Sequence, residues 1–263
     1  MKTILVPIGS EKSGVSTLQY AIDLASNVGA SVYAIKAFGA VLRTGSLKKF
    51  DDVLEADAKT ILNTVLQKTD KKGVQVIAKT VKGDITGSIE RIARQLNVDL
   101  IVGTFKIKKD SRVFLGKIAA NLIKNTNVPV LFIPYEYTFK PVNKILMAIK
   151  SGYIANPKVL EPVQDIKNSF NATLDLLQVY TPDVRANDKN LNENLDKIKD
   201  SLTTTENATI FQGILEHINH FTPDLIFVIR RKRGFFARLW QKGRVYKKDF
   251  ESRIPLLVLK VAE

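Results

Sequence analysis

The chain has 263 residues, of which 45% are hydrophobic, so it can bury the core of one large domain or of two ordinary ones. It contains no cysteine, which excludes disulfides, thiol catalysis and cysteine-bound zinc or iron–sulfur clusters. The net charge of +14 and the isoelectric point near 9.7 indicate either an attraction to anions, such as nucleic acid, anionic lipid or phosphorylated ligands, or only good solubility.

Apolar runs and amphipathic segments alternate through the first half of the chain. Strand-like runs occupy residues 3–8, 31–38, 74–81, 99–105 and 129–134. Helical patterns lie between them, over residues 15–28, 54–65, 85–97 and 115–126, and Gly29 and Gly73 stand where the first two should stop. Strands that alternate with helices predict βαβ units and a parallel sheet.

The segment 134–142 breaks this rhythm with two prolines and three aromatic residues, and we interpret it as a linker. The pattern then restarts, because residues 143–150, 172–180, 222–230 and 252–260 repeat four of the earlier strand-like runs in the same order. Matched order across four elements indicates a duplicated domain. We therefore predict one domain over residues 1–138 and a more divergent one over residues 139–263, each of ordinary size.

Three stretches of the first half carry a family resemblance: "KTILVPI…STLQYAIDLASNVGASVYAIKAF", "KGDITGSIERIARQLNVDLIVGT" and "NVPVLFIP". Together they resemble a universal stress protein domain. The second half resembles it more loosely, through "KILMAIK", "PDLIFVIR" and "IPLLVLK". The whole chain is therefore similar to a tandem universal stress protein, and its late segment is similar to the second halves of tandem members from Bacteroidetes-type bacteria.

The resemblance implies an architecture and a mode of pairing. The fold class is α/β, with two tandem open five-stranded parallel sheets flanked by helices, as in Rossmann-like proteins. Many members dimerise through their last strand, and tandem members can form that pairing within one chain. We therefore expect pseudo-twofold pairing of the two domains, with a homodimer as a further option.

The resemblance also implies a place for ATP. Family members that bind ATP resemble one another in Gly-x2-Gly-x9-Gly-(Ser/Thr) after the fourth strand, where backbone N–H groups approach the phosphates. In this chain the pattern falls on Gly103, Lys106, Gly116 and Lys117, and Thr104 follows the first glycine. The spacing is kept, but a lysine at position 106 fills space and resists the positive φ angles that glycine permits.

A second departure from the family concerns the end of the first strand. ATP-binding members usually have an aspartate there that contacts the nucleoside, whereas this chain has Gly9 and Ser10. The second half has Lys150 near the corresponding place and lacks an intact glycine loop. These departures predict degraded nucleotide sites and no certain cofactor.

The lysines keep ATP open as an alternative. Five cations crowd the loop at the carboxyl end of the predicted sheet, where open α/β folds bind ligands: Lys106, Lys108, Lys109, Arg112 and Lys117. Lysine can hold a phosphate as a point charge rather than through a backbone cradle. The other interpretation of this loop, which we favour, is a solvated segment without a ligand.

A second basic stretch runs over residues 230–248 without an acidic residue. We define its basic patch as Arg230, Arg231, Lys232, Arg233 and Arg238. Phe235, Phe236, Trp240 and Tyr246 are interleaved with these cations, and such aromatic residues can stack on single-stranded bases. Because Phe235, Phe236 and Trp240 also share helical spacing, we favour packing or a partner contact, and we do not expect nucleic-acid binding.

Catalysis has little support in the sequence. The only histidines, His217 and His220, are too few for a metal site, and no serine lies in a nucleophile-elbow motif. The first apolar run is too short for a signal peptide, and no run approaches the roughly 18 residues of a membrane span. We therefore expect a cytoplasmic, non-enzymatic stress-response protein that acts through ligand or protein binding, with nucleotide binding by the loop lysines as the alternative.

Overall fold

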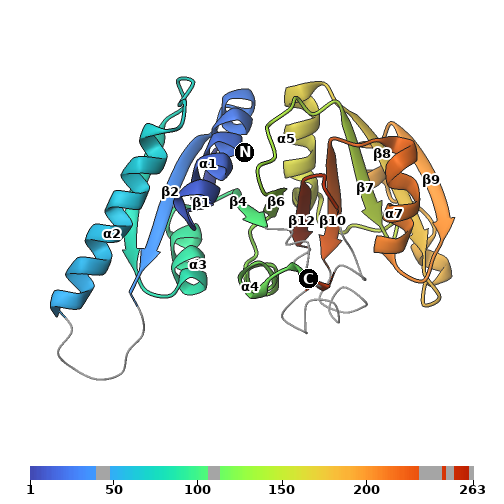
Figure 1. The fold of residues 1–263 in the computed structure, drawn as a ribbon. Helices are drawn as coiled ribbons and strands as arrows, with labels where there is room; N and C mark the ends of the chain where they lie inside the picture. Colours follow the sequence, from blue (N-terminus) through green and yellow to red (C-terminus); the bar gives the residue numbers. More distant parts are fainter. Residues whose placement is uncertain (40–47, 106–112, 231–244, 247–251, 261–263) are drawn as a thin grey trace. The chain divides into compact units, whose positions relative to one another are not determined.

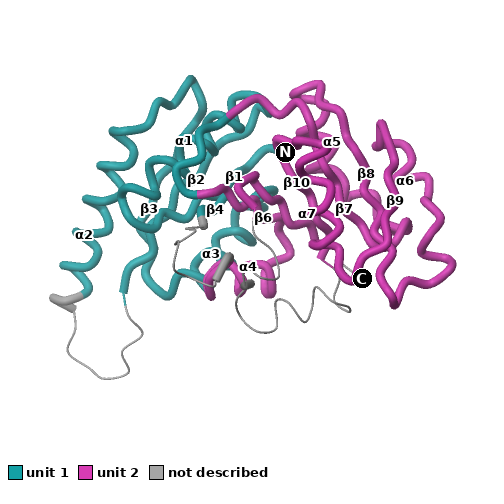
Figure 2. Tube along the Cα trace, turned by 45° about the vertical axis from the view of Figure 1, so that its right-hand side comes forward, with its two compact units in different colours: residues 1–104, 135–139 teal, residues 105–134, 140–263 magenta. Residues whose placement is uncertain are grey.

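Mostly parallel β-strands flanked by helices form the centre of each of two compact units in the computed structural model (Figure 1). The structure describes residues 1–39, 48–105, 113–230, 245–246 and 252–260. Unit 1 consists of residues 1–104 and 135–139, and unit 2 of residues 105–134 and 140–263 (Figure 2). The chain therefore enters unit 2, returns briefly to unit 1 and then completes unit 2.

Unit 1 is an open α/β layer. Its strands are β1 (Thr3–Pro7), β2 (Ser31–Phe38), β3 (Val76–Lys82) and β4 (Leu100–Phe105), and its helices are α1 (Glu11–Val28), α2 (Lys48–Gln67) and α3 (Ile85–Gln95). The strands lie in the order β3-β2-β1-β4, and each neighbouring pair is parallel. The strand order reverses between β1 and β4, which is where open α/β sheets bind ligands.

The local sequence explains the elements of unit 1. Ile4, Leu5 and Val6 of β1 are fully buried, as expected for a parallel strand that is covered on both faces. Helix α1 ends at Gly29, whose φ of 71° lies in the left-handed region that glycine adopts without strain. Gly14 allows α1 to approach α2, because a Cβ there would lie 2.9 Å from a methyl group of Val65.

Unit 2 contains a larger sheet and a short ribbon. Its strands are β5 (Val113–Leu115), β6 (Val130–Pro134), β7 (Lys144–Ile149), β8 (Thr173–Tyr180), β9 (Ser201–Glu206), β10 (Leu225–Arg230), β11 (Val245–Tyr246) and β12 (Leu256–Lys260). Its helices are α4 (Lys117–Asn125), α5 (Glu161–Phe170), α6 (Glu193–Asp196) and α7 (Ile210–Phe221), with 3-10 turns at Pro157–Leu160 and Ala186–Asp188.

The larger sheet of unit 2 has the order β6-β12-β10-β7-β8-β9. Strands β12, β10, β7, β8 and β9 pair in parallel, whereas β6 pairs antiparallel with β12. β5 and β11 form a separate antiparallel ribbon. The strand order reverses between β7 and β10, as it does between β1 and β4 in unit 1.

One hydrogen-bonding device occurs in both halves. Asp99, just before β4, accepts from the backbone N–H groups of Lys2 and Thr3 at 2.6 and 3.0 Å. Asp224, just before β10, accepts in the same way from Asn143 and Lys144, at 2.8 and 2.9 Å. The same local interaction thus fixes the strand at the reversal point to its neighbour in each half, as a duplicated domain requires.

The predicted fold class is confirmed, and so is the prediction that the last strands of the two halves are neighbours. Residues 130–132 of β6 pair antiparallel with residues 256–258 of β12. This pairing places β6, the fifth strand of the first sequence half, within unit 2. Pseudo-twofold symmetry of the two halves and the domain boundary at residue 138 stay predictions.

The hydrophobic pattern missed three strands. β9 lies at an edge of its sheet, and its residues Leu202, Thr204 and Glu206 are exposed, so it lacks an apolar run. β5 and β11 are too short for a period of two to be recognised. Edge position and shortness, rather than an unusual composition, explain these omissions.

Candidate functional site

The candidate site in unit 1 lies at the carboxyl ends of β1 and β4. Gly9 and Ser10 follow β1, and Gly103 and Thr104 lie near the end of β4. Because β1 and β4 are neighbouring parallel strands, these four predicted residues reach one edge of the sheet. That edge is at the reversal of strand order, where a ligand would be expected.

Ser10 caps the N-terminus of α1 at this edge. Its hydroxyl accepts a hydrogen bond from the backbone N–H of Ser13 at 3.4 Å and lies 2.8 Å from the Ser13 hydroxyl. The first turn of a helix carries a partial positive charge, which favours an anion. The hydroxyls of Ser10 and Ser13 already bond to each other, so the cap is satisfied without a ligand.

The hydroxyl of Thr104 is hydrogen-bonded to α1. Thr17 donates to the carbonyl oxygen of Ser13 at 2.6 Å, and its hydroxyl also bonds to that of Thr104. A hydroxyl has one proton, so Thr104 must be the donor in the bond between the two threonines. The Thr104 hydroxyl can therefore accept further hydrogen bonds but has no proton left to donate to a phosphate oxygen.

Lys36 of β2 is a site residue that the sequence reasoning missed. Its ammonium group donates a hydrogen bond to the carbonyl oxygen of Gly9. The side chain is half-buried, and this burial lowers the pKa of Lys36. Within the described ranges it forms no ion pair with a carboxylate. The signal in the sequence was a single cation inside the otherwise apolar run "SVYAIKAF".

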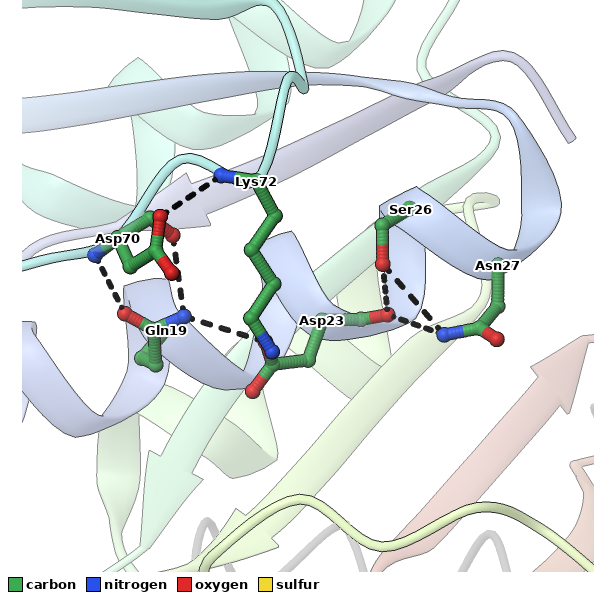
Figure 3. Close-up of polar contacts among 6 residues, drawn as sticks. All are labelled: Gln19, Asp23, Ser26, Asn27, Asp70 and Lys72. Carbon is green, nitrogen blue, oxygen red and sulfur yellow. Dashed lines mark hydrogen bonds and ion pairs between the residues drawn. The ribbon is translucent and has the colours of Figure 1, made fainter.

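A polar network ties α1 to the turn between α2 and β3 (Figure 3). The Gln19 amide accepts from the backbone N–H of Asp70 at 2.8 Å and donates to its carbonyl oxygen at 3.1 Å. Asp23, which is largely buried, forms an ion pair with Lys72 at 2.7 Å. The hydrogen bond to Asp23 is the main cause that raises the pKa of Lys72.

The predicted linker packs on the same helix. The ring of Tyr20 in α1 lies 5.2 Å from that of Phe139, edge to face, and 6.1 Å from that of Tyr137. Lys12 forms an ion pair with Glu136 at 2.7 Å, and this interaction raises the pKa of Lys12. The aromatic residues that interrupt the sequence pattern therefore have a packing role in unit 1.

The remaining loop residues do not join this edge within unit 1. Lys106 lies outside the described residues, as do Lys108, Lys109 and Arg112. Gly116 and Lys117 belong to unit 2, where they are the N-cap and the first residue of α4, and both are exposed. Gly116 has a φ of −75°, which any residue can adopt, and a Cβ added there would have no atom within 4 Å. Neither the backbone conformation nor the available space therefore requires a glycine at this position.

The corresponding edge of unit 2 carries an ion pair. Lys150, which follows β7, lies 2.5 Å from a carboxylate oxygen of Asp183. The hydrogen bond from Lys150 is the main cause that lowers the pKa of Asp183. The lysine that stands near the place of the family's aspartate is thus already paired with a carboxylate of the same chain.

The loop after β8 covers this edge of unit 2. Gly152 donates to the carbonyl oxygen of Asp188 at 2.7 Å and accepts from the N–H of Asn192 at 2.8 Å. A Cβ at Gly152 would lie only 2.2 Å from the carbonyl oxygen of Asn190. Gln178, the counterpart of Lys36 in the repeat, is fully buried and donates to Asp188 at 2.8 Å. The backbone of the loop is therefore packed closely against Gly152.

One residue of the basic patch, Arg230, belongs to the described part of the chain. Arg230 ends β10, whereas Arg231, Lys232, Arg233 and Arg238 lie outside the described residues. Burial lowers the pKa of Arg230, and its buried Nη1 has no hydrogen-bond partner in the described part of the chain.

The histidines form no site. Nδ1 of His217 lies 2.8 Å from the carbonyl oxygen of Gly213, one turn earlier in α7, and His220 is exposed on the same helix. Among the described residues, no group of three histidine, aspartate or glutamate side chains could hold a metal ion. No helix in those ranges is both long and apolar enough to cross a membrane.

Comparison with known proteins decides the family. The model of the universal stress protein family matches residues 1–134, about half of the chain. The chain belongs to the universal stress protein family. A universal stress protein of Methanocaldococcus jannaschii is 28% identical over 138 residues, which cover 50% of this chain and 81% of that protein.

Solved structures agree on the fold of this universal stress protein. A universal stress protein from Archaeoglobus fulgidus superposes with a TM-score of 0.71 at 15% identity, covering 99% of this chain and 97% of that one. A putative universal stress protein from Pseudomonas aeruginosa gives a TM-score of 0.64 at 16% identity, with 99% and 93% covered. At such identities the likeness concerns the fold alone.

Proposed function

We propose that this universal stress protein is a non-enzymatic binding protein whose nucleotide sites are degraded and which acts in a stress response through another ligand or a protein partner. The observation that carries the proposal is the hydrogen bond from the ammonium group of Lys36 to the carbonyl oxygen of Gly9. It places a cation at the end of the first strand, where the family resemblance implies an aspartate that contacts a nucleoside.

The second half supports the same proposal. Lys150 is paired with Asp183, and the backbone around Asn190 closes over Gly152. A nucleotide would have to displace this loop and its hydrogen bonds before it could reach the end of β7. Each such buried backbone hydrogen bond contributes about 0.5–1.5 kcal/mol net. Breaking several of them would therefore cost more free energy than the binding of a weak ligand releases.

One observation favours the second candidate function, which is nucleotide binding by lysines. Lys36 has no carboxylate partner among the residues that the structure describes, and it lies near the N-terminus of α1. A phosphate could replace the Gly9 carbonyl as its partner. Against this, Thr104 already donates its hydroxyl proton to Thr17, which leaves fewer hydrogen-bond donors for a phosphate at this edge of the sheet.

A direct measurement separates the two functions. The purified protein is denatured, and the supernatant is searched for nucleotide by mass spectrometry, followed by titration calorimetry of the native protein with ATP. We expect no stoichiometric nucleotide and weak or undetectable binding. Stoichiometric nucleotide, or micromolar affinity that Lys36→Met abolishes, would establish the second function instead.

A variant tests whether the altered loop is the cause. We expect Lys106→Gly combined with Lys117→Ser to raise ATP affinity modestly, by about five- to tenfold. One recovered charge-assisted hydrogen bond is worth about 1.5–3 kcal/mol, whereas each exposed charge that is lost contributes about 1 kcal/mol or less in salt. Lys106→Gln with Lys117→Gln removes the same charges without restoring glycine or hydroxyl, and it should show no gain.

A further inference from the structure

β9 is the outermost strand of the sheet in unit 2 (Figure 1). It pairs in parallel with β8, and no other strand of the described residues lies on its second side. The backbone N–H and C=O groups that point to that side therefore have no strand partner in the described part of the chain. Such a row of groups is a template on which a further strand can pair.

The sequence of β9 does not protect this edge. Edge strands usually carry lysine, proline or a bulge that prevents pairing with another chain. β3, the edge strand of unit 1, follows this rule, because Lys79 and Lys82 are exposed on it. β9 reads Ser-Leu-Thr-Thr-Thr-Glu, has no lysine or proline, and pairs with β8 without a shift of register. Its one charged residue, Glu206, is the last.

β9 also exposes an apolar side chain on one of its two faces. A Cβ at Gly213 of α7 would lie 3.3 Å from a methyl group of Thr205, so α7 packs on the face that carries Thr205. Successive residues of a strand alternate between the faces, which places Leu202 and Thr204 on the opposite one. Leu202 is 42% exposed there, and Thr204 is exposed as well. A leucine exposed on an unprotected edge suits the addition of another strand.

We propose that β9 pairs with β9 of a second copy of this chain, antiparallel and around a twofold axis. The two strands are then equal in length, and each supplies partners for the free backbone groups of the other. Opposite residues of a pair lie on the same face of the sheet, so one residue of β9 must face its own copy at the axis. The side chains decide which residue that is.

A register centred on Thr203 fits the side chains of β9. It pairs residues 201–205 of one copy with residues 205–201 of the other. Leu202 then lies opposite Thr204 of the second copy, on the exposed face. The two copies of Leu202 flank the axis on a diagonal that long side chains can span, so each leucine loses contact with water.

The register centred on the next residue, Thr204, fits less well. It would place Leu202 opposite the carboxylate of Glu206, which offers an apolar side chain no contact. In the register centred on Thr203, Glu206 instead lies opposite Asp200 of the second copy. The charge of Asp200 is already compensated within its own chain by Lys167, at 2.7 Å.

Sedimentation velocity of the native chain provides the first test. Because the interface consists of one strand pair and two leucines, we expect a dimer with a dissociation constant of about 10–100 µM. Leu202→Lys introduces the residue that protects other edges and should weaken dimerisation about tenfold or more. Leu215→Lys makes the same change at a leucine of α7 that is 38% exposed, and it should dimerise like the native protein.

A cysteine scan determines the register, because the chain contains no cysteine of its own. Opposite residues of an antiparallel pair have Cα atoms about 4.5–5.5 Å apart, a distance that a disulfide spans. On oxidation with copper phenanthroline, Thr203→Cys should therefore form a linked dimer about tenfold or more faster than Leu215→Cys, which reports random collisions. Leu202→Cys and Thr204→Cys hold their thiols apart on the diagonal and should react more slowly than Thr203→Cys.

Four results would overturn the proposal. The first is a monomer at every concentration up to about 0.5 mM, which would leave the edge of β9 to a strand of another protein. The others are a dimer that a folded Leu202→Lys variant does not weaken, linking of Thr203→Cys no faster than that of Leu215→Cys, and a scan with its maximum at Leu202→Cys or Thr204→Cys. Circular dichroism establishes whether Leu202→Lys is folded. If it is not, the native chain and the cysteine scan decide the question by themselves.

Discussion

At the scale of single residues, a lysine ammonium group reaches the end of the first strand in each half of this universal stress protein. Lys36 donates a hydrogen bond to the carbonyl oxygen of Gly9, and Lys150 pairs with Asp183. An ammonium group attracts anions, whereas an aspartate would accept hydrogen bonds from a sugar.

The Lys72–Asp23 pair yields a prediction at this scale. Lys72 is half-exposed and Asp23 largely buried, so Lys72→Met leaves a buried carboxylate unpaired, whereas Asp23→Asn leaves a solvated ammonium and keeps an acceptor for Gln19. We expect Lys72→Met to lower the melting temperature more than Asp23→Asn does. Thermal unfolding monitored by circular dichroism at neutral pH gives the comparison, and the opposite order would contradict it.

The same pair has a predictable pH dependence. The pKa of Lys72 is raised above 10.5 by its hydrogen bond to Asp23, so its stabilising contribution is complete below pH 10.5 and is lost as the pH rises through the folded value. The difference in melting temperature between the native protein and Lys72→Met should therefore be constant from about pH 6 to 9 and shrink above about pH 10.5. A difference that shrinks on acidification from pH 9 to 6 would argue against this assignment.

At the scale of elements, the two halves differ in what lies over the carboxyl edge of the sheet. In unit 2 the loop after β8 bonds to Gly152 through both its N–H and its carbonyl oxygen. Among the described residues of unit 1, hydroxyl contacts and the Lys36 ammonium group lie at the corresponding edge, and no backbone loop bonds to Gly9 as the loop of unit 2 bonds to Gly152.

The closed loop of unit 2 gives an element-scale prediction. Gly152→Ala would place a methyl group against the backbone of Asn190, which cannot move away as a side-chain end could. We expect a loss of about 1–3 kcal/mol in the free energy of unfolding, measured with urea. Gly9→Ala is the matched control, because its Cβ would meet only Ser13 at 3.4 Å, and its effect should stay within about 0.5 kcal/mol.

At the scale of the whole molecule, the compact units do not follow the sequence repeat. The chain from residue 105 to 134 belongs to unit 2, and β6 within it pairs with β12. Cutting at the predicted boundary would separate β6 from β12 and β5 from β11. Each fragment would then expose an unpaired strand edge that is rich in buried apolar residues.

We therefore expect residues 1–138 and 139–263 to be poorly soluble when expressed apart and to copurify when expressed together. The measurement uses an affinity tag on one fragment and size-exclusion chromatography of the eluted pair. A charged pair of substitutions inside β6, Leu131→Lys with Phe132→Glu, should abolish copurification. Two fragments that fold separately as soluble monomers would show that the β6–β12 pairing is dispensable.

The sequence by itself determined the α/β class, the repeat and the positions of all the described strands except β5, β9 and β11. Those features depend on hydrophobic periodicity and on local signals such as Gly29, which act over short distances along the chain. Only the tertiary structure decided that Lys36 contacts Gly9, that the loop around Asn190 closes over Gly152, and that β5 pairs with β11. These contacts join residues that are distant in sequence, and their energies depend on which groups folding brings together rather than on local pattern.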